Sequence, residues 1–253
     1  MSTVAVVQAR MTSTRLPGKV MLEVLGKPML EFQLERVRQV SLIDDIIIAT
    51  TTNATDDAVA DFARASGFGL HRGSESDVLD RFEGAIASTD ARTVVRLTAD
   101  CPLIDPDEIE RVIRRYHDAD PVCDYVTNAI PRSYPAGLDV EVFSREVLEM
   151  AAVETHDAYN REHVTPFLYL NPERFRLLSV VCEPDLSRER WTLDEPGDFE
   201  LIRRVLERLY PTCPDFRMAD VIRVLNENPE WRAFNGSVRE KARMLEDVVF
   251  KGE

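Results

Sequence analysis

The chain has 253 residues, 44% of them hydrophobic and 30% charged, which is typical of one large globular domain with ample length to bury a core. Its formal net charge of −14 argues against nonspecific binding to nucleic acid or to an anionic membrane, and no apolar run approaches the ~18 residues of a spanning helix. Four cysteines without a C-x-x-C pair, and a start without a charged-then-apolar leader, favour a cytoplasmic protein with no zinc or dithiol site.

The chain begins with a buried strand and a basic loop, within residues 3–19. Its first half is an apolar run of β-branched character, which predicts a strand covered on both faces. Its second half carries Arg10, Arg15 and Lys19 among hydroxyl residues. Such a loop suits a polyanion held at the carboxyl end of a sheet, although a solvated basic loop would have the same composition. The glycine spacings of Walker and dinucleotide loops are missing, so side-chain cations would hold the phosphate.

The next hundred residues alternate between helical and strand patterns. Helical periodicity predicts helices over residues 28–40, 56–66 and 76–88. Apolar runs predict strands over residues 46–50 and 69–71, and a fourth strand, within residues 93–102, that ends in the carboxylate of Asp100. Strands separated by helices of this length predict a mostly parallel sheet in a three-layer α/β/α, Rossmann-like fold. Arg10 and Asp100 each follow a strand end, so we expect them to share one crevice.

The tetrapeptide Asp105-Pro106-Asp107-Glu108 has the Asp-x-Asp spacing of a metal-dependent glycosyltransferase. A helix start explains it better. Asp105 suits the N-cap, Pro106 the first helical position, and Glu108 the third, where it would complete a capping box for a helix ending at His117. We therefore expect no metal at this tetrapeptide.

The pattern changes from Pro121 onward. Strands are predicted over residues 123–127, 138–143 and 175–181, and a helix over residues 144–152. The second of these strands alternates apolar and acidic residues, which predicts that one of its faces is exposed. A short strand is then expected to end at Asp194 before a helix that runs to about Leu209, and Asp194 could simply cap that helix. Residues 211–253 have helical patterns, clearest from Met218 to Leu225, and then a charged tail without evident chemistry.

The pattern Ala9-Arg10-x-x-Ser13-x-Arg15-x-Pro17-x-Lys19 resembles the nucleotide-binding signature of the cytidylyltransferases that activate 3-deoxy-2-keto sugar acids. These include the CMP-sialate and CMP-KDO synthetases, and the most similar subgroup is the SpsF-like branch of spore coat polysaccharide biosynthesis. The resemblance runs from residue 3 to about residue 210. It implies a nucleotide-diphospho-sugar transferase-like fold in a single domain, residues 1–253, with a core over residues 1–210 and a small β-rich dimerisation and acceptor insertion over residues 123–182.

The resemblance also implies roles for individual residues. The nucleotide-binding set would be Ala9, Arg10, Ser13, Arg15, Lys19 and Thr98. The catalytic set would be Arg10, Lys19 and Asp100. Asp100 and Asp194 would hold the catalytic Mg2+, an ion for which one or two carboxylates are enough.

The prediction of a binding site for the acceptor substrate depends on two further motifs. They are Pro135-x-Gly137-x-Asp139-x-Glu141-Val142-Phe143 and Arg161-Glu162-His163-Val164-Thr165-Pro166. They resemble the acceptor-side segments of the same family, although hairpin alternation and a structural histidine would explain them equally well. The implied acceptor-binding residues are Tyr134, Asp139, Glu141 and His163. Arg132 and Arg161 are both candidates to bind an acceptor carboxylate.

The reaction implied is transfer of CMP from CTP to the hydroxyl of a 2-keto-3-deoxy sugar acid or related small anionic acceptor, with release of pyrophosphate, in surface polysaccharide biosynthesis. The partners expected are these substrates and a second copy of the chain, with no nucleic acid and no membrane. Two alternatives remain. One is a GT-A-like glycosyltransferase, which would need an Asp-x-Asp where this chain has Asp100-Cys101-Pro102. The other is a catalytically silent nucleotide-binding module.

Overall fold

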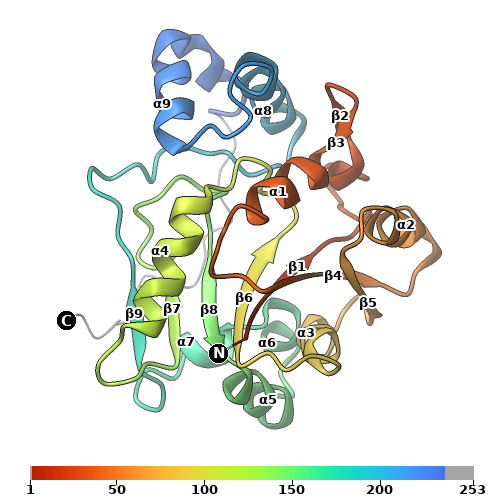
Figure 1. Cartoon of the computed structure of the whole chain (residues 1–253), viewed down its shortest axis with the longest axis vertical. Coiled ribbons are helices and arrows are strands. Elements are labelled where there is room, and N and C mark those ends of the chain that lie inside the picture. Colours follow the sequence, from red (N-terminus) through yellow and green to blue (C-terminus); the bar gives the residue numbers. More distant parts are fainter. Residues whose placement is uncertain (1, 237–253) are drawn as a thin grey trace.

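The fold is built on one seven-stranded sheet with the strand order β5-β4-β1-β6-β8-β7-β9 (Figure 1). The structure is a computed structural model, and it describes residues 2–236. β1, β4, β5 and β6 are mutually parallel, β8 runs antiparallel to β6 and β7, and β9 is parallel to β7. The strands are β1 (Thr3–Gln8), β4 (Asp45–Thr51), β5 (Gly69–Gly73), β6 (Thr93–Thr98), β7 (Tyr125–Thr127), β8 (Glu141–Ser144) and β9 (Leu177–Ser179), with a separate hairpin of β2 (Glu23–Val24) and β3 (Lys27–Pro28). The predicted mostly parallel sheet is confirmed.

Helices cover both faces of this sheet. They are α1 (Met29–Val37), α2 (Asp57–Ala65), α3 (Val78–Ile86), α4 (Pro106–His117), α5 (Arg145–Glu154), α6 (Ala158–His163), α7 (Pro166–Tyr169), α8 (Pro196–Leu209) and α9 (Met218–Glu227), with short 3-10 turns η1 (Lys19–Met21), η2 (Ala54–Asp56) and η3 (Pro229–Phe234). One apolar cluster joins the sheet to α1, α2, α4, α8 and α9, and a second joins it to α3, α5 and α7. The molecule is therefore the predicted three-layer α/β/α sandwich.

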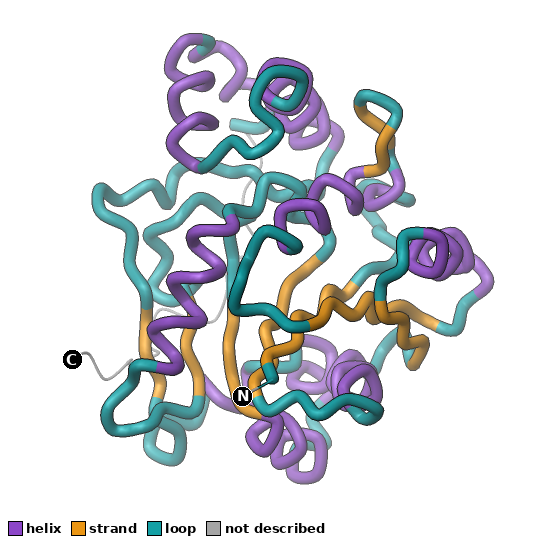
Figure 2. Tube along the Cα trace, in the orientation of Figure 1, coloured by secondary structure: helices purple, strands orange, loops and turns teal. Residues whose placement is uncertain are grey.

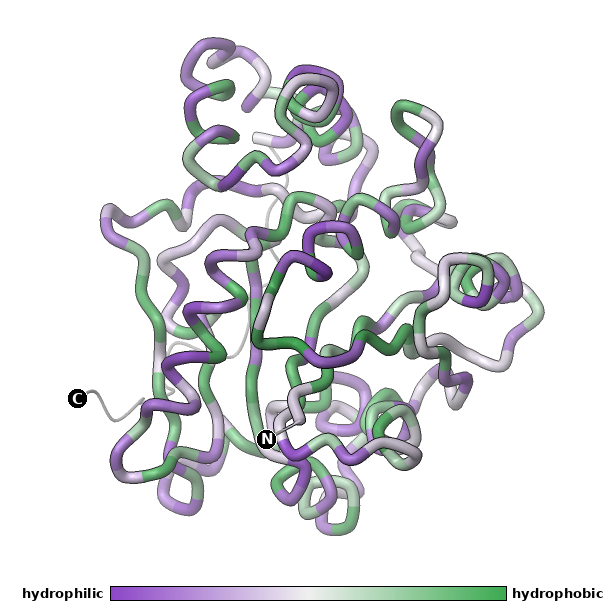
Figure 3. The backbone as a smooth tube through the Cα atoms, in the orientation of Figure 1, coloured by the Kyte–Doolittle hydropathy of each residue, from purple (hydrophilic) through white to green (hydrophobic). Residues whose placement is uncertain are grey.

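β1 shows how the sequence specifies these layers. Val4 and Val6 belong to one apolar cluster, whereas Ala5 and Val7 belong to the other. Successive side chains of a strand point to opposite faces, so an uninterrupted apolar run fits a central strand covered on both sides. Figure 3 shows the same hydrophobic character along the central strands.

The predicted insertion, residues 123–182, contributes β7, β8 and β9 to the same sheet. β8 was expected to expose one face, and this expectation is wrong, because β8 lies between β6 and β7 and its first three residues are buried. Its acidic Glu141 is accommodated by an ion pair with Arg96 of β6. The expected short strand before Asp194 is reduced to a single bridge between Ala136 and Arg190. Of the predicted C-terminal segment, residues 211–253, the part from residue 237 onward lies outside the described residues.

The helix predicted from the Asp-x-Asp tetrapeptide is α4. Asp105 is its N-cap, fully covered by the fold, and accepts a hydrogen bond from the N–H of Asp107 at 2.9 Å. Pro106 is the first helical residue, as expected. The predicted capping box, in which the Glu108 carboxylate would accept from the N–H of Asp105, is not formed. The second carboxylate oxygen of Asp105 accepts from the N–H of Met218 at 2.5 Å. This aspartate is a structural cap.

A long irregular segment, residues 180–195, runs from β9 to α8 (Figure 2). In Figure 1, α8 and α9 lie at the end of the molecule toward which β6 points. The segment therefore passes the carboxyl ends of the parallel strands, where α/β proteins of this kind bind their ligands. None of the helices within residues 2–236 is long and apolar enough to cross a membrane.

Candidate active site

The loop after β1 is held in place by a buried carboxylate. Asp56, which is fully buried, accepts a hydrogen bond from the N–H of Met11 at 2.7 Å and another from the hydroxyl of Thr51. The loop closes on itself where the N–H of Gly18 donates to the carbonyl of Met11 at 2.8 Å. Gly18 adopts a φ of 72°, a left-handed conformation that costs a residue without a Cβ very little. The sequence had suggested only a helix start at Asp56.

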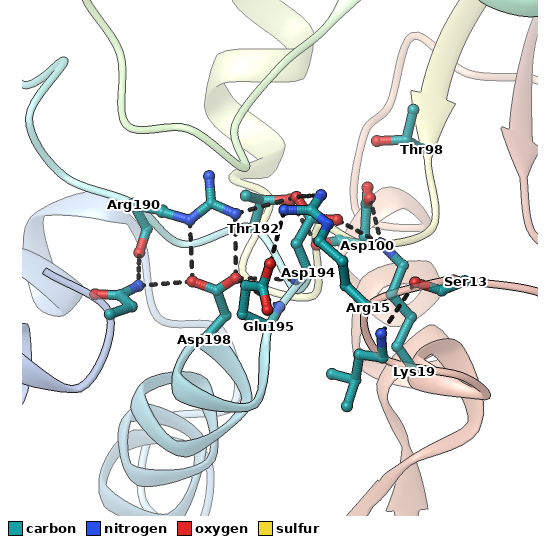
Figure 4. Close-up of polar contacts among 12 residues, drawn as sticks. Ser13, Arg15, Lys19, Thr98, Asp100, Arg190, Thr192, Asp194, Glu195 and Asp198 are labelled. Carbon is teal, nitrogen blue, oxygen red and sulfur yellow. Dashed lines mark hydrogen bonds and ion pairs between the residues drawn. The ribbon is translucent and has the colours of Figure 1, made fainter. Parts of the chain in front are cut away.

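The closed loop brings Lys19 to two carboxylates at the carboxyl end of β6. Its Nζ lies 2.8 Å from Asp100 Oδ2 and 2.8 Å from Asp194 Oδ1 (Figure 4). The N–H of Leu193 donates to the carbonyl of Asp100 at 2.8 Å, which fixes the two acidic segments relative to each other. The Lys19 side chain is only 12% exposed. Two acidic oxygens from distant parts of the chain therefore converge on one cation.

The electrostatics of this cluster favour its charged state. Burial disfavours the ammonium of Lys19, but the charges and hydrogen bonds of Asp100 and Asp194 outweigh burial and raise the pKa of Lys19 above 10.5. Burial likewise disfavours the carboxylate of Asp100, but the Lys19 ammonium outweighs it, so the pKa of Asp100 falls below 3.8. Lys19 and Asp100 are thus both charged at neutral pH.

The second oxygen of Asp194 is held by two guanidinium groups. Asp194 Oδ2 lies 3.1 Å from Arg15 and 3.0 Å from Arg190. Arg15 also bonds the carboxylate of Glu195 at 3.1 Å. Glu195, and not Asp194, is the N-cap of α8, so the capping interpretation of Asp194 is wrong. Arg190 was not predicted as a site residue, because it lies in the irregular segment, which has no periodic pattern.

A cavity of about 430 Å³ opens beside this cluster. Predicted residues that line it are Arg15, Thr98, Asp100, Asp139, Glu141, His163 and Asp194. Arg132 also lines it and forms a two-point ion pair with Asp139, at 2.8 and 2.9 Å. Arg161, the other candidate for an acceptor carboxylate, bonds Asp77 at 2.6 Å and does not line the cavity.

Two predicted acceptor residues have other surroundings than expected. Tyr134 is 1% exposed and is not among the residues that line the cavity, so the structure does not bring it to the site. Glu141 lines the cavity, but its carboxylate accepts hydrogen bonds from the hydroxyls of Tyr125 and Thr165, both at 2.6 Å, and pairs with Arg96. The carboxylate of Glu141, on strand β8, is therefore bonded within the protein at the wall of the cavity.

Arg10 lies apart from the Lys19 cluster, in a neighbouring cavity of about 160 Å³. Ala9 also lines this smaller cavity, and Gln8 and His163 line both. Arg10 pairs with Glu75 at 3.3 Å. The expected single crevice is therefore divided into two adjacent cavities, because Arg10 turns toward the loop after β5 while Asp100 follows β6.

The remaining predicted nucleotide-binding residues are polar groups of the loop and strand end. The Ser13 hydroxyl accepts a hydrogen bond from the N–H of Leu16 at 3.3 Å, so it helps to shape the loop. Thr98, at the end of β6, has its hydroxyl 3.5 Å from the Cys101 sulfur.

The residues present fit a magnesium ion bound by few protein ligands. Within residues 2–236 there is no group of three or more histidine, cysteine or acidic side chains that could hold a metal. Asp100 Oδ2 and Asp194 Oδ1 nevertheless face one common cation, the Lys19 ammonium. Mg2+ prefers oxygen ligands and retains several waters, so two carboxylates suffice for it, whereas a zinc site would need more.

The sequence model of the family described as cytidylyltransferase matches residues 4–215 of this chain. The chain belongs to the cytidylyltransferase family. It is 32% identical to the spore coat polysaccharide biosynthesis protein SpsF of Bacillus subtilis, over 89% of this chain and 94% of that protein. It is 36% identical to the 3-deoxy-manno-octulosonate cytidylyltransferase of Geobacter metallireducens, over 45% of this chain and 44% of that one. A solved structure of a cytidylyltransferase from Leptospira borgpetersenii matches with a TM-score of 0.87 and 29% identity, covering 96% of this chain and 100% of that chain.

These matches confirm the family resemblance and the fold that it implied. Nucleotidyl transfer is the class of reaction of this cytidylyltransferase. The family match begins at β1 and includes Lys19, Asp100 and Asp194, so the cluster at the carboxyl end of β6 lies within the matched residues.

Proposed function

We propose that this cytidylyltransferase moves CMP from CTP to the hydroxyl of a 2-keto-3-deoxy sugar acid or a related small anionic acceptor. The observation that carries the proposal is the position of Lys19 between Asp100 and Asp194, beside a cavity of about 430 Å³. The names of the SpsF and 3-deoxy-manno-octulosonate relatives support a sugar-acid acceptor and a role in polysaccharide biosynthesis.

The donor triphosphate would lie along the loop after β1. Arg15 and Lys19 supply fixed positive charge there, and the Ser13 hydroxyl and loop N–H groups supply donors. The smaller cavity next to Ala9 and Arg10 is the place we propose for the nucleoside. Because the protein has an overall charge of −14, an anionic nucleotide would need such a local cluster of cations to bind.

Asp100 and Asp194 would hold Mg2+, which when bound neutralises phosphate charge and lowers the barrier to displacement at the α-phosphate. Lys19 would then transfer its hydrogen bonds from the carboxylates to phosphate oxygens. Arg15 and Arg190 keep the second oxygen of Asp194 occupied, so the first oxygen stays directed into the site. Catalysis would rest on positioning and electrostatics, without a covalent intermediate on the protein.

The acceptor would occupy the large cavity. Arg132, Asp139 and His163 line it and offer polar groups to a hydroxylated, anionic ligand. In the reaction the acceptor oxygen bonds to the α-phosphorus, the bond to the β-phosphate breaks, pyrophosphate leaves, and the hydroxyl proton passes to solvent. A homodimer and a cytoplasmic location stay predictions.

Pyrophosphate release tests this proposal. The purified protein should release pyrophosphate from CTP only when a sugar acid such as 3-deoxy-manno-octulosonate or a sialic acid is present, and about 100-fold faster with CTP than with UTP, GTP or ATP. The matched control is the neutral sugar of the same carbon number. Pyrophosphate release that is independent of the base would overturn the assignment of CTP as the donor. Consumption of a nucleotide sugar in place of CTP would overturn the proposal in favour of a glycosyltransferase. The Asp-x-Asp spacing at Asp105 does not support a glycosyltransferase, because Asp105 caps helix α4.

A further inference from the structure

A further carboxylate, that of Asp198, bonds residues of the Lys19 cluster and does not itself line the cavity. Asp198 is the third residue of α8, and its side chain is fully buried. A buried carboxylate is costly unless donors surround it. The structure provides five, which are the N–H groups of Asp194 (3.0 Å) and Glu195 (2.9 Å), the Nε and a terminal nitrogen of Arg190 (3.0 and 3.1 Å), and Nδ2 of Asn235 (2.9 Å).

These bonds fix both the backbone and the partner of Asp194. Two of them hold the N–H groups of Asp194 and the next residue, and two more hold Arg190. Arg190 in turn donates to Asp194 Oδ2 at 3.0 Å. Figure 4 shows Asp198 at the start of α8 with the Arg190 guanidinium against it. Asp198 thus bonds both the backbone of Asp194 and the arginine that holds the second oxygen of Asp194.

The end of the described chain supports the same carboxylate. Asn235 is 6% exposed, and its Nδ2 donates to Asp198 Oδ1 and to the carbonyl of Arg190, both at 2.9 Å. The 3-10 turn η3 packs directly on the start of α8, because a Cβ on Gly197 would lie 2.1 Å from the carbonyl oxygen of Phe234. A segment in which the sequence showed no chemistry therefore lies behind the site.

We propose that Asp198 is a positioning residue that directs the Asp194 carboxylate toward the metal and phosphate position, with Asn235 as its support. The inference rests on the proposed function, since it assigns Asp194 to Mg2+. Asp198 touches neither substrate nor metal and acts only through Asp194 and Arg190. Removing its charge should therefore loosen metal-linked binding of CTP and leave metal-free binding of CTP, which depends on Arg15 and Lys19, unchanged.

The test is the dissociation constant of CTP, measured calorimetrically with Mg2+ and with a chelator, for wild type and for Asp198→Asn. We expect the factor by which Mg2+ tightens CTP binding to fall about 10- to 100-fold in the variant. The matched control is Asp220→Asn. Asp220 is likewise the third residue of its helix, α9, and accepts a hydrogen bond from the N–H of Arg217 at 3.0 Å, but it lines neither cavity. This control should retain the wild-type factor.

A folded Asp198→Asn protein with the wild-type factor would overturn the inference and leave the proposed function standing. A variant with a lower melting temperature but an unchanged factor would reduce Asp198 to a helix cap. If Asp198→Asn does not fold, Asn235→Ala decides the question, because loss of one of the five hydrogen bonds should lower the factor roughly fivefold. A wild-type protein whose CTP affinity does not respond to Mg2+ would overturn the magnesium site itself, and this inference with it.

Discussion

Replacement of Asp100 by asparagine is expected to lower kcat/KM for CTP about 10³-fold while the protein stays folded. Asparagine keeps the shape of the side chain but removes the charge that faces Lys19 at 2.8 Å. It also removes one of the two carboxylates proposed for Mg2+. Steady-state rates of pyrophosphate release, together with circular dichroism to verify folding, measure the effect.

The matched control for this prediction is Asp107→Asn. Asp107 belongs to the Asp-x-Asp tetrapeptide, but its side chain is 67% exposed and pairs with Arg217 at 3.1 Å, away from the cavity. Its loss should change the rate less than about twofold, as for an ordinary surface substitution. If Asp100→Asn retained near wild-type turnover while Asp107→Asn lost it, the site would have to be moved from the end of β6 to the start of α4.

Replacement of Lys19 by methionine is expected to have two effects of opposite sign. Turnover should fall about 10²- to 10³-fold, because a fixed charge next to the phosphates is lost. Binding of Mg2+ to the nucleotide-free protein should tighten, because the ammonium now lies between the two carboxylates and competes with any other cation. Coulomb repulsion between two cations that share these oxygens is strong at such short distances.

Lys27→Met is the control for the lysine substitution. Lys27 bonds the hydroxyl of Tyr210 at 2.7 Å and pairs with Glu31 at 3.4 Å, and it lines neither cavity. The Lys27→Met substitution should therefore leave both turnover and Mg2+ binding unchanged. Calorimetric titration with Mg2+ in the absence of nucleotide separates the two effects. Unchanged or weaker Mg2+ binding by Lys19→Met would show that Lys19 does not occupy the metal position.

The sequence was sufficient to predict most of the Lys19 cluster at the carboxyl end of β6. The apolar run of β1 and the cations after it are local features, so Lys19 and Asp100 could be identified from their neighbours in the chain. Asp194 was assigned only by resemblance, since its surroundings also fitted a helix cap. The structure distinguishes the two interpretations, because Glu195 is the N-cap and Asp194 bonds Lys19.

Features that depend on distant contacts could not be predicted. Asp198 and Asn235 are 37 residues apart, and no periodic pattern connects them. The division between the Arg10 and Asp100 cavities depends on which way a side chain turns after its strand ends, and strand patterns do not specify this. Tyr134 has the right motif neighbours, yet it packs in the core.

The measurement that tests the central claim most directly is thermal unfolding with CTP, UTP, GTP and ATP, each with Mg2+ and with a chelator. The claim is that the loop after β1 and the carboxylates at the end of β6 form a metal-dependent CTP site. A ligand at ~100 times its dissociation constant adds roughly 2.7 kcal/mol to the free energy of unfolding, which for a chain of this size raises the melting temperature by roughly 5 to 10 °C. We expect such a shift with CTP, larger with Mg2+ than without, and little with the other nucleotides. An equal shift with all four nucleotides, or none with any, would contradict the claim.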